Sequence, residues 1–246
     1  MILEVEGLTK SFGGLMAVNK VDLQIEDREL SSIIGPNGAG KTTLFNLLSG
    51  KLRPSSGRVI FKGEEISKLS PREICLKGIG RSFQRVNIFP RLSTFDNVQI
   101  AVLSEQKKTR NLFIPVRKMV REKTKEILES VMLADKEEVL AGLLSHGDQK
   151  RLELGIALAT RPKLLLLDEP TAGMSPEETK KTTELIQEIV QDQGLTLILI
   201  EHDMSVVFRI SEKIRVMHMG RMIAEGKPEE VKANNEVQKI YIGEEA

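Results

Sequence analysis

Eight consecutive residues, GPNGAGKT, have the types and spacing of a phosphate-binding loop, G-x-x-x-x-G-K-[ST]. Glycines let the backbone turn tightly and bring its N–H groups close to phosphate oxygens, and the helix that follows offers its positive end to the same anion. Lys41 is placed to reach the β- and γ-phosphates as a catalytic group, and the Thr42 hydroxyl is suited to Mg²⁺. The residues expected to bind the nucleotide here are Gly35, Pro36, Asn37, Gly38, Ala39, Gly40, Lys41, Thr42 and Thr43.

Two adjacent carboxylates follow a short apolar stretch in LLLLDEP, residues 164–170. A strand of this kind delivers its last residues to the carboxyl edge of a parallel sheet, where ligands of open α/β sheets bind. Asp168 is expected to bind Mg²⁺, and Glu169 is expected to act as the general base that polarises the attacking water. The alternative is a strand that merely stops in an acidic turn at Pro170.

Two more apolar stretches end in polar residues that could reach the same site. GIGRSF is followed by Gln84, whose amide could contact both the metal and the attacking water. LTLILIE is followed by His202, which could contact the γ-phosphate or hold Glu169 in place. Each is weak evidence alone, since such residues are usually surface or structural groups, but their order along the chain makes them informative.

The segment LLSHGDQKRLELG, residues 143–155, begins a helix with unusual residues. Apolar residues recur at helical spacing after Gln149, whereas Ser145, His146, Gly147 and Asp148 precede them. This start is consistent with a capped helix N-terminus and also with a device that directs N–H groups at an anion.

The arrangement of helix and strand patterns predicts an α/β protein with a mostly parallel sheet. In the second half of the chain the patterns alternate as helix 147–160, strand 164–168, helix 176–192, strand 195–200, helix 203–211 and strand 214–218, with a helix after Pro228. From about residue 95 to 145 strand patterns vanish and charged helical sequence replaces them, which predicts an inserted helical subdomain. Capping boxes are expected at Ser70 and Ser175, each followed by proline and, three residues on, by glutamate.

Composition narrows the classes of protein and partner. The 246 residues carry 36 Lys and Arg against 35 Asp and Glu, so a net charge of +1 gives no case for nucleic acid as the main partner. A single cysteine, Cys75, rules out an internal disulfide. The first residues do not look like a signal peptide, and the longest apolar runs are far shorter than the roughly 18 residues of a membrane span. Any work at a membrane would therefore need another chain.

The ordered set of motifs resembles the nucleotide-binding subunit of an ABC transporter over essentially the whole chain. The order is the phosphate loop, the glutamine loop, the helical insertion, LSHGDQ, LLLLDEP, MSPE and then the histidine. In that family the segment matching residues 144–149 is the signature motif, which binds the γ-phosphate of ATP held by the other subunit. The resemblance therefore implies that Ser145, Gly147 and Gln149 bind nucleotide across a dimer interface. His146 replaces the glycine most common in the family, and Asp148 also departs from the commonest form.

Further expectations follow from the same resemblance. It implies a P-loop ATPase core with an N-terminal antiparallel β subdomain, with residues 1–246 forming a single nucleotide-binding domain that contains the helical insertion. Phe12 would stack on the adenine and Val18 would pack near it. ATP and Mg²⁺ are the implied cofactors. Implied partners are integral-membrane permease subunits, a second ATP-binding subunit (identical or homologous) and, indirectly, an external solute-binding protein, at the cytoplasmic face of the membrane.

Several stretches resemble one branch of the family, the ATP-binding subunits of branched-chain amino-acid importers. They are GIGRSFQRVNIFPRLSTFDNV, LSHGDQKRLELGIAL and KIYIGEEA. Urea and amide importers, lipopolysaccharide export and soluble ABC ATPases, such as those of iron–sulfur assembly, are the alternatives. A P-loop kinase or GTPase would leave the signature segment and His202 without a role.

Overall fold

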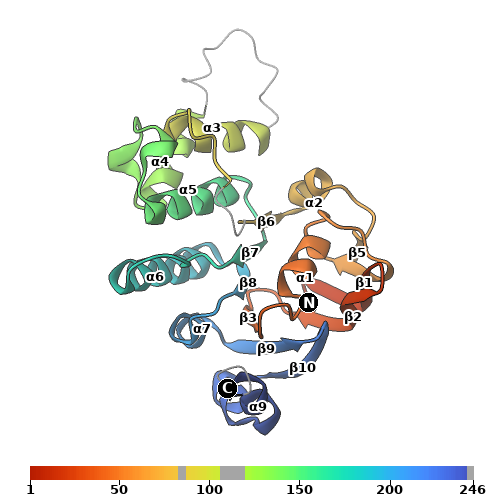
Figure 1. Ribbon diagram of the computed structural model, residues 1–246. Helices are drawn as coiled ribbons and strands as arrows, with labels where there is room; N and C mark the ends of the chain where they lie inside the picture. The colour runs from red at the N-terminus through yellow and green to blue at the C-terminus, as the bar shows by residue number, and fades with distance from the viewer. Residues whose placement is uncertain (83–86, 106–119, 243–246) are drawn as a thin grey trace.

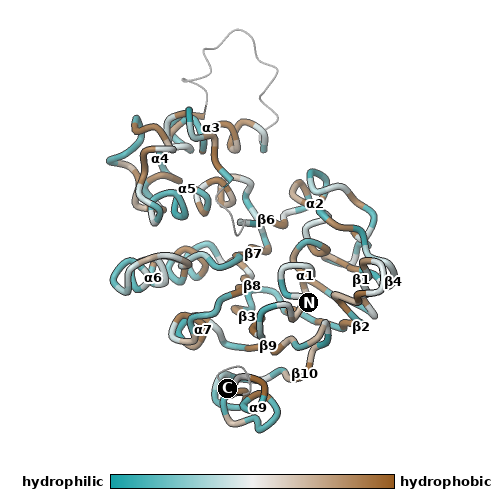
Figure 2. Tube along the Cα trace, in the orientation of Figure 1, coloured by the Kyte–Doolittle hydropathy of each residue, from teal (hydrophilic) through white to brown (hydrophobic). Residues whose placement is uncertain are grey.

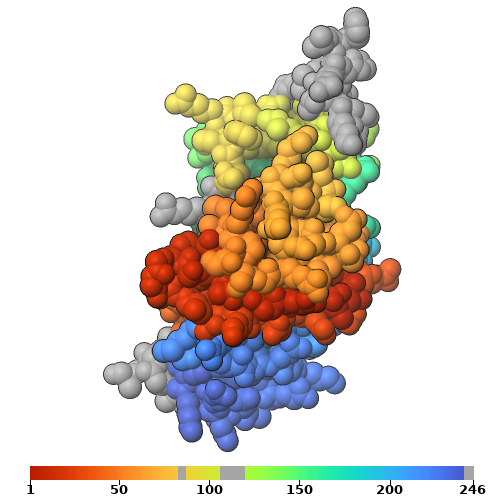
Figure 3. Space-filling model, turned by 90° about the vertical axis from the view of Figure 1, so that its right-hand side faces the viewer, coloured from red at the N-terminus to blue at the C-terminus, as the bar shows by residue number. Residues whose placement is uncertain are grey.

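The computed structural model describes residues 1–82, 87–105 and 120–242 and contains two β-sheets flanked by helices (Figure 1). The first sheet has the order β2-β1-β4-β5, and all its neighbouring strands are antiparallel. Its strands are β1 (Leu3–Phe12), β2 (Leu15–Ile25), β4 (Ser56–Phe61) and β5 (Glu64–Glu65). Figure 3 shows the N-terminal strands as a band between the 50–80 segment above and the C-terminal residues below.

The second sheet has the order β10-β9-β3-β8-β7-β6, and only β10 runs antiparallel to its neighbour. Its strands are β3 (Leu30–Ile34), β6 (Ile79–Arg81), β7 (Leu164–Asp168), β8 (Thr196–Ile200), β9 (Lys213–His218) and β10 (Arg221–Gly226). The predicted mostly parallel sheet and the α/β class are thus confirmed. Parallel order brings the ends of β3, β7 and β8 to one edge, where the candidate site lies.

The helices largely follow the sequence pattern. They are α1 (Lys41–Leu48), α2 (Pro71–Lys77), α3 (Thr94–Glu105), α4 (Arg121–Ser130), α5 (His146–Ala159), α6 (Pro176–Gln193), α7 (Met204–Ile210), α8 (Pro228–Ala233) and α9 (Asn235–Ile242), with 3-10 turns at Ala134–Lys136 and Ala141–Leu143. The single tail helix expected after Pro228 is instead two, because Asn234 adopts an extended backbone and its side chain accepts the N–H of Glu236. No helix within the described ranges is long and apolar enough to cross a membrane.

Within the described residues, the segment expected to be a helical insertion contains α3, α4 and the two 3-10 turns, together with short turns and loops. α3 packs against both α4 and α5, and Figure 1 shows these three helices together, apart from α1 and the antiparallel sheet. A β-bridge between Ser93 and Leu140 brings the two ends of the segment together. Both capping boxes form as expected: Ser70 and Ser175 each accept the backbone N–H of the glutamate three residues on.

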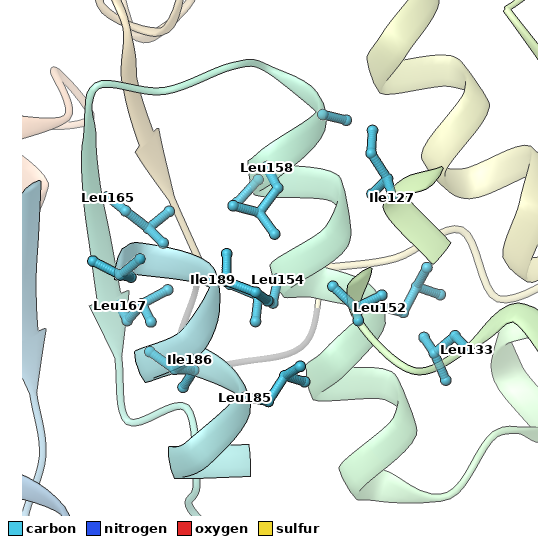
Figure 4. Packing of buried hydrophobic residues seen from close by; sticks show 14 of the residues in the cluster. Ile127, Leu133, Leu152, Leu154, Leu158, Leu165, Leu167, Leu185, Ile186 and Ile189 are labelled. Atoms are coloured by element: carbon cyan, nitrogen blue, oxygen red, sulfur yellow. The ribbon is translucent and has the colours of Figure 1, made fainter. Parts of the chain in front are cut away.

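The core explains the continuous apolar runs of the central strands. Alternate residues of a strand face opposite sides of the sheet, so Leu165 and Leu167 join one hydrophobic cluster whereas Leu164 and Leu166 join another. In Figure 4, Leu152, Leu154 and Leu158 of α5 lie between the helical insertion and the residues of β7 and α6. Hydrophilic and hydrophobic residues are interspersed along the flanking helices (Figure 2), as expected for elements with one buried face. Because α5 packs against β7 in this core, the position of Ser145, which precedes α5, is fixed relative to Asp168 at the end of β7.

A buried ion cluster fastens β9 beside β3. Arg215, with essentially no exposed surface, donates from Nη1 to Glu29 (2.7 Å) and from Nε to Glu225 (2.9 Å). Its Nη2 also donates to the Gln24 carbonyl at 2.6 Å. Glu29 is itself buried, so its charge depends on this arginine.

We predict that Arg215→Met lowers the free energy of unfolding by about 3 kcal/mol or more, because it leaves the Glu29 carboxylate buried without its partner. Urea unfolding measures the change. Lys213→Met is the control, since Lys213 pairs with Glu225 at the half-exposed end of the same cluster and its loss should cost much less. Equal losses for the two variants would contradict this account of the cluster.

Candidate active site

The phosphate loop connects β3 to α1 with a backbone that requires glycine. Gly35 has a φ of +147°, and a Cβ there would lie 2.0 Å from the Met217 carbonyl oxygen of β9. Gly40 has a φ of +102°, and its Cβ would lie 2.2 Å from the Ala17 carbonyl oxygen. The loop is therefore packed tightly against the strands around it, and α1 starts at Lys41 immediately after it. This is the strand–loop–helix context that the sequence motif needs.

Lys41 is buried, and its ammonium group lies within the loop. Nζ donates to the carbonyl oxygens of Gly35 and Pro36, the latter at 2.9 Å. These two carbonyls hold the Lys41 ammonium group inside the loop, where the sequence motif predicts that the phosphates bind.

Asp168 ends β7 with no exposed surface, and Thr42 lines the same cavity of about 740 Å³. Burial raises the pKa of Asp168, although the charge of Arg81 opposes the shift. Its Oδ1 has no hydrogen-bond partner among the described residues. A buried carboxylate oxygen of this kind, in a cavity that Thr42 also lines, fits the oxygen ligands that Mg²⁺ prefers. Gln84, the third expected metal ligand and a catalytic candidate, lies outside the described residues.

Arg81, at the end of β6, is a site residue that sequence reasoning missed. Its Nη2 lies 3.4 Å from Asp168 Oδ2, while Nη1 donates to Asn46 of α1 and to Ser49, the residue that caps the end of α1, at 2.8 Å each. The guanidinium also lies 5.7 Å from the centre of the Phe45 ring. One cation thus joins β6, α1 and β7. The available signal was a lone arginine inside the apolar stretch GIGRSF, just before Gln84.

Glu169 is held beside His202 at the carboxyl edge of the sheet. The Glu169 Oε1 and His202 Nε2 atoms are 3.0 Å apart. Glu169 has a φ of +51°, an uncommon conformation for a residue with a side chain, and its N–H donates to the Ile200 carbonyl at 2.8 Å. The buried Glu201 accepts the Thr171 N–H and the His202 N–H, which ties the loop after β7 to the end of β8. The structure therefore brings the proposed base and the histidine together.

The segment 144–149 forms a capped helix start, with Gly147 in the first turn of α5. Ser145 Oγ accepts the Asp148 N–H at 3.1 Å, so the capping interpretation holds. Gln149 donates its side-chain amide to the carbonyls of Leu144 (3.2 Å) and Ala141 (3.4 Å), and its contact with nucleotide stays a prediction. These hydrogen bonds stabilise the backbone that leads into α5.

Asp148, which like His146 departs from the commonest form of the signature motif, has a structural role. Its buried carboxylate pairs with Lys136 at 2.5 Å and with Arg151. Burial alone would raise the pKa of Asp148, but the hydrogen bonds from Lys136 and Ser145 outweigh it and the pKa is lowered. The residue fastens the start of α5 to the helical insertion.

Phe12 and Val18, the two residues expected to contact the adenine, differ in their exposure to solvent. Phe12 ends β1 with 47% of its surface exposed, so it is free to stack on a base and is not a core residue. Val18, in contrast, is fully buried among the core residues of β1 and β2, and its contact with the base stays a prediction.

The chain also contains Asn19-Lys20-Val21-Asp22, which has the N-K-x-D spacing used in guanine recognition. In the structure these residues lie within β2 of the antiparallel sheet, ahead of the phosphate loop. Val21 is buried in the core, and Asp22 accepts the Gly7 N–H at 2.7 Å. The tetrapeptide is thus part of a strand and gives no support for GTP as the nucleotide.

Together the loop, Lys41 and the acidic end of β7 define a P-loop nucleotide-binding protein. The sequence matches the ABC transporter family over residues 18–172, and a shorter model, described as branched-chain amino acid ATP-binding cassette transporter, over residues 221–246. The chain therefore belongs to the ABC transporter family as an ATP-binding subunit, and it is an ATPase of that family.

Curated relatives cover almost the whole chain. The high-affinity branched-chain amino acid transport ATP-binding protein BraF of Pseudomonas aeruginosa is 41% identical over 99% of this chain and 98% of its own length. LivG of Escherichia coli, with the same description, is 38% identical over the same shares. The lipopolysaccharide export ATP-binding protein LptB of Haemophilus influenzae is 34% identical, again over 99% and 98%.

Solved structures agree. The ADP conformation of MJ1267, an ATP-binding cassette of an ABC transporter, has a TM-score of 0.85 and 32% identity, covering 98% of each chain. A dimeric post-hydrolysis cassette, MJ0796 bound to ADP and phosphate, has a TM-score of 0.80 and 27% identity, covering 92% of this chain and 99% of its own. The fold and the binding of nucleotide are thus shown.

We predict that Arg81→Met lowers the free energy of unfolding by about 3 kcal/mol, because it leaves the Asp168 charge buried without its cation. The double variant Arg81→Met/Asp168→Asn should recover much of this loss, since the uncompensated charge is then gone. Urea unfolding of the two single variants and the double variant measures the coupling. Strictly additive losses would contradict a direct interaction between the two side chains.

Proposed function

We propose that this chain is the ATP-hydrolysing subunit of a membrane importer for branched-chain, hydrophobic amino acids. The observation that carries the proposal is similarity along nearly the full length to BraF and LivG, at a higher identity than to the lipopolysaccharide-export relative. The match of residues 221–246 to a branched-chain family model supports the same branch. The subunit itself would not select the solute, which falls to the permease and an external binding protein.

The hydrolytic site would be built on the carboxyl edge of the parallel sheet. The glycine loop and the start of α1 would bind the phosphates, with Lys41 turning from the loop carbonyls to the β- and γ-phosphates. Phe12 would stack on the adenine. Thr42 and Asp168, together with Gln84, would hold Mg²⁺, which when bound neutralises charge that develops on the phosphates.

Glu169 would take a proton from the water that attacks the γ-phosphate. His202, 3.0 Å from its carboxylate, orients that carboxylate and is placed at the same edge of the sheet as the phosphate loop. General base catalysis of this kind contributes about 10²- to 10⁴-fold in rate.

A second ATP-binding subunit, identical or homologous, would complete the site. The chain has one phosphate loop and one signature segment, and Figure 1 shows α1 and α5 on opposite sides of β6 and β7. Ser145 and Gly147 would therefore bind the γ-phosphate of ATP held by the partner. ATP would close the dimer because it adds these contacts only in the closed state.

The permease would dock between α2 and α3, at the cytoplasmic face of the membrane. A cavity of about 610 Å³ there is lined by Leu76, Phe89 and Ile100, which are 50%, 56% and 42% exposed. Large apolar side chains so exposed are typical of a contact surface. Closure of the dimer would then move the membrane subunits as rigid bodies.

Affinity purification of the tagged chain from its native membranes tests the function. We expect polytopic permease subunits to co-purify, with uptake of leucine, isoleucine or valine lost when the chain is removed. The matched control is the Leu76→Asp/Ile100→Asp variant, which should retain ATP binding but lose the permease. A set of purely soluble partners would refute the transporter assignment and leave the ATPase standing.

We predict that Glu169→Gln retains ATP affinity, lowers the rate of hydrolysis at least about 100-fold, and traps a dimer in the presence of ATP. The glutamine is isosteric and still accepts a hydrogen bond from His202, so the fold should be unaffected. Hydrolysis assays and sizing by light scattering measure both effects. Normal hydrolysis by this variant would reject Glu169 as the base.

A further inference from the structure

His146 and Lys150, one helical turn apart on α5, both contact the loop that carries Glu169. His146 Nε2 lies 3.1 Å from the Ala172 carbonyl oxygen. Lys150 is buried and donates from Nζ to the Glu169 carbonyl oxygen at 3.3 Å. Residues four apart lie on the same face of a helix, so one face of α5 grips both ends of a short loop. We call these two side chains the α5 clamp.

The loop is shaped to receive the histidine. Gly173 has a φ of +78°, and a Cβ there would lie 3.3 Å from the His146 ring atoms Cδ2 and Nε2. A side chain at Gly173 would therefore crowd the imidazole. The absence of a side chain at position 173 therefore leaves room for the imidazole of His146 beside the loop.

Glu169 depends on such contacts for its position. Its φ of +51° is uncommon for a residue with a side chain, and surrounding contacts must maintain such a conformation. The Glu169 N–H donates to the Ile200 carbonyl, and the Glu169 carbonyl accepts a hydrogen bond from Lys150 Nζ. The Glu169 carboxylate lies beside the His202 ring. A shift of α5 would act directly on Glu169 through Lys150. It would also act on Ala172, three residues after Glu169, through His146.

We propose that the α5 clamp couples the two ATP sites of the dimer, with His146 and Lys150 as positioning residues. This rests on the proposed function, in which Ser145 and Gly147, on either side of His146, bind ATP held by the partner. ATP bound by one subunit would thereby fix the signature segment of the other and, through the clamp, the catalytic glutamate of that other subunit. Each Glu169 would become competent only when the opposite site is filled.

The test compares clamp variants in the assembled ATP-hydrolysing dimer. We expect His146→Ala to lower kcat about fivefold, the effect of one hydrogen bond of about 1 kcal/mol, and to lower the Hill coefficient for ATP towards 1. Lys150→Met should act in the same direction, and His146→Gln, which keeps a side-chain donor, should restore part of both values. Lys123→Met, which removes an exposed lysine from α4, is the control and should change neither.

Two further measurements separate the possible outcomes. ATP affinity of the isolated chain and ATP-dependent dimer formation in the Glu169→Gln background should change less than about twofold in His146→Ala. Unchanged kcat and Hill coefficient would overturn the clamp. Loss of dimer formation with unchanged kcat per dimer would also overturn it, because His146 would then act on the partner's nucleotide. A wild-type protein that neither dimerises with ATP nor hydrolyses it would refute the proposed function, and the clamp with it.

Discussion

The Asp168 carboxylate has no exposed surface and lies where β6, β7 and α1 meet, so its charge must be balanced by a cation inside the protein. Arg81 of β6 supplies the balancing charge to Asp168, and the same guanidinium donates to Asn46 of α1 and to Ser49, the C-cap residue of that helix. One cation at the end of β6 therefore contacts the helix that follows the phosphate loop and the end of β7, the strand that leads to Asp168 and Glu169. Asp168 keeps one oxygen without a partner among the described residues, and in the proposed function this is the oxygen that would be available to Mg²⁺.

The second constraint is the division of the site between two parts of the chain. The phosphate loop is packed against β9 and β2, whereas the signature segment begins a helix that is buried between the insertion and the parallel sheet. The hydrophobic residues of α5 fix it to both neighbours, so a displacement of its N-terminus is transmitted to the loop after β7. In the proposed dimer, hydrolysis would depend on how a second subunit contacts the start of this helix as well as on the residues around the phosphates.

Sequence patterns predicted the parallel sheet, its flanking helices and both capping boxes because each depends on local periodicity or on residues three apart. The phosphate loop and Asp168-Glu169 were likewise predictable, since their chemistry needs fixed residue types at fixed spacing. The burial of Val18, the contacts of Arg81 and the positive φ of Glu169 were not, because each is decided by residues distant in sequence. For His146 the sequence showed only a departure from the family. Its contact with Ala172 depends on how α5 packs beside the end of β7.

The shared site is tested most directly with ATP that carries a photoreactive group on its γ-phosphate. This chain would carry Lys41→Ala, so that it cannot hold the nucleotide, in a complex with an unmodified second ATP-binding subunit. The account predicts that residues 144–149 of this chain are still labelled, since the nucleotide that they contact belongs to the partner. Labelling of this segment in the isolated wild-type chain, together with its loss in the Lys41→Ala complex, would show that the site is completed within one chain and would contradict the account.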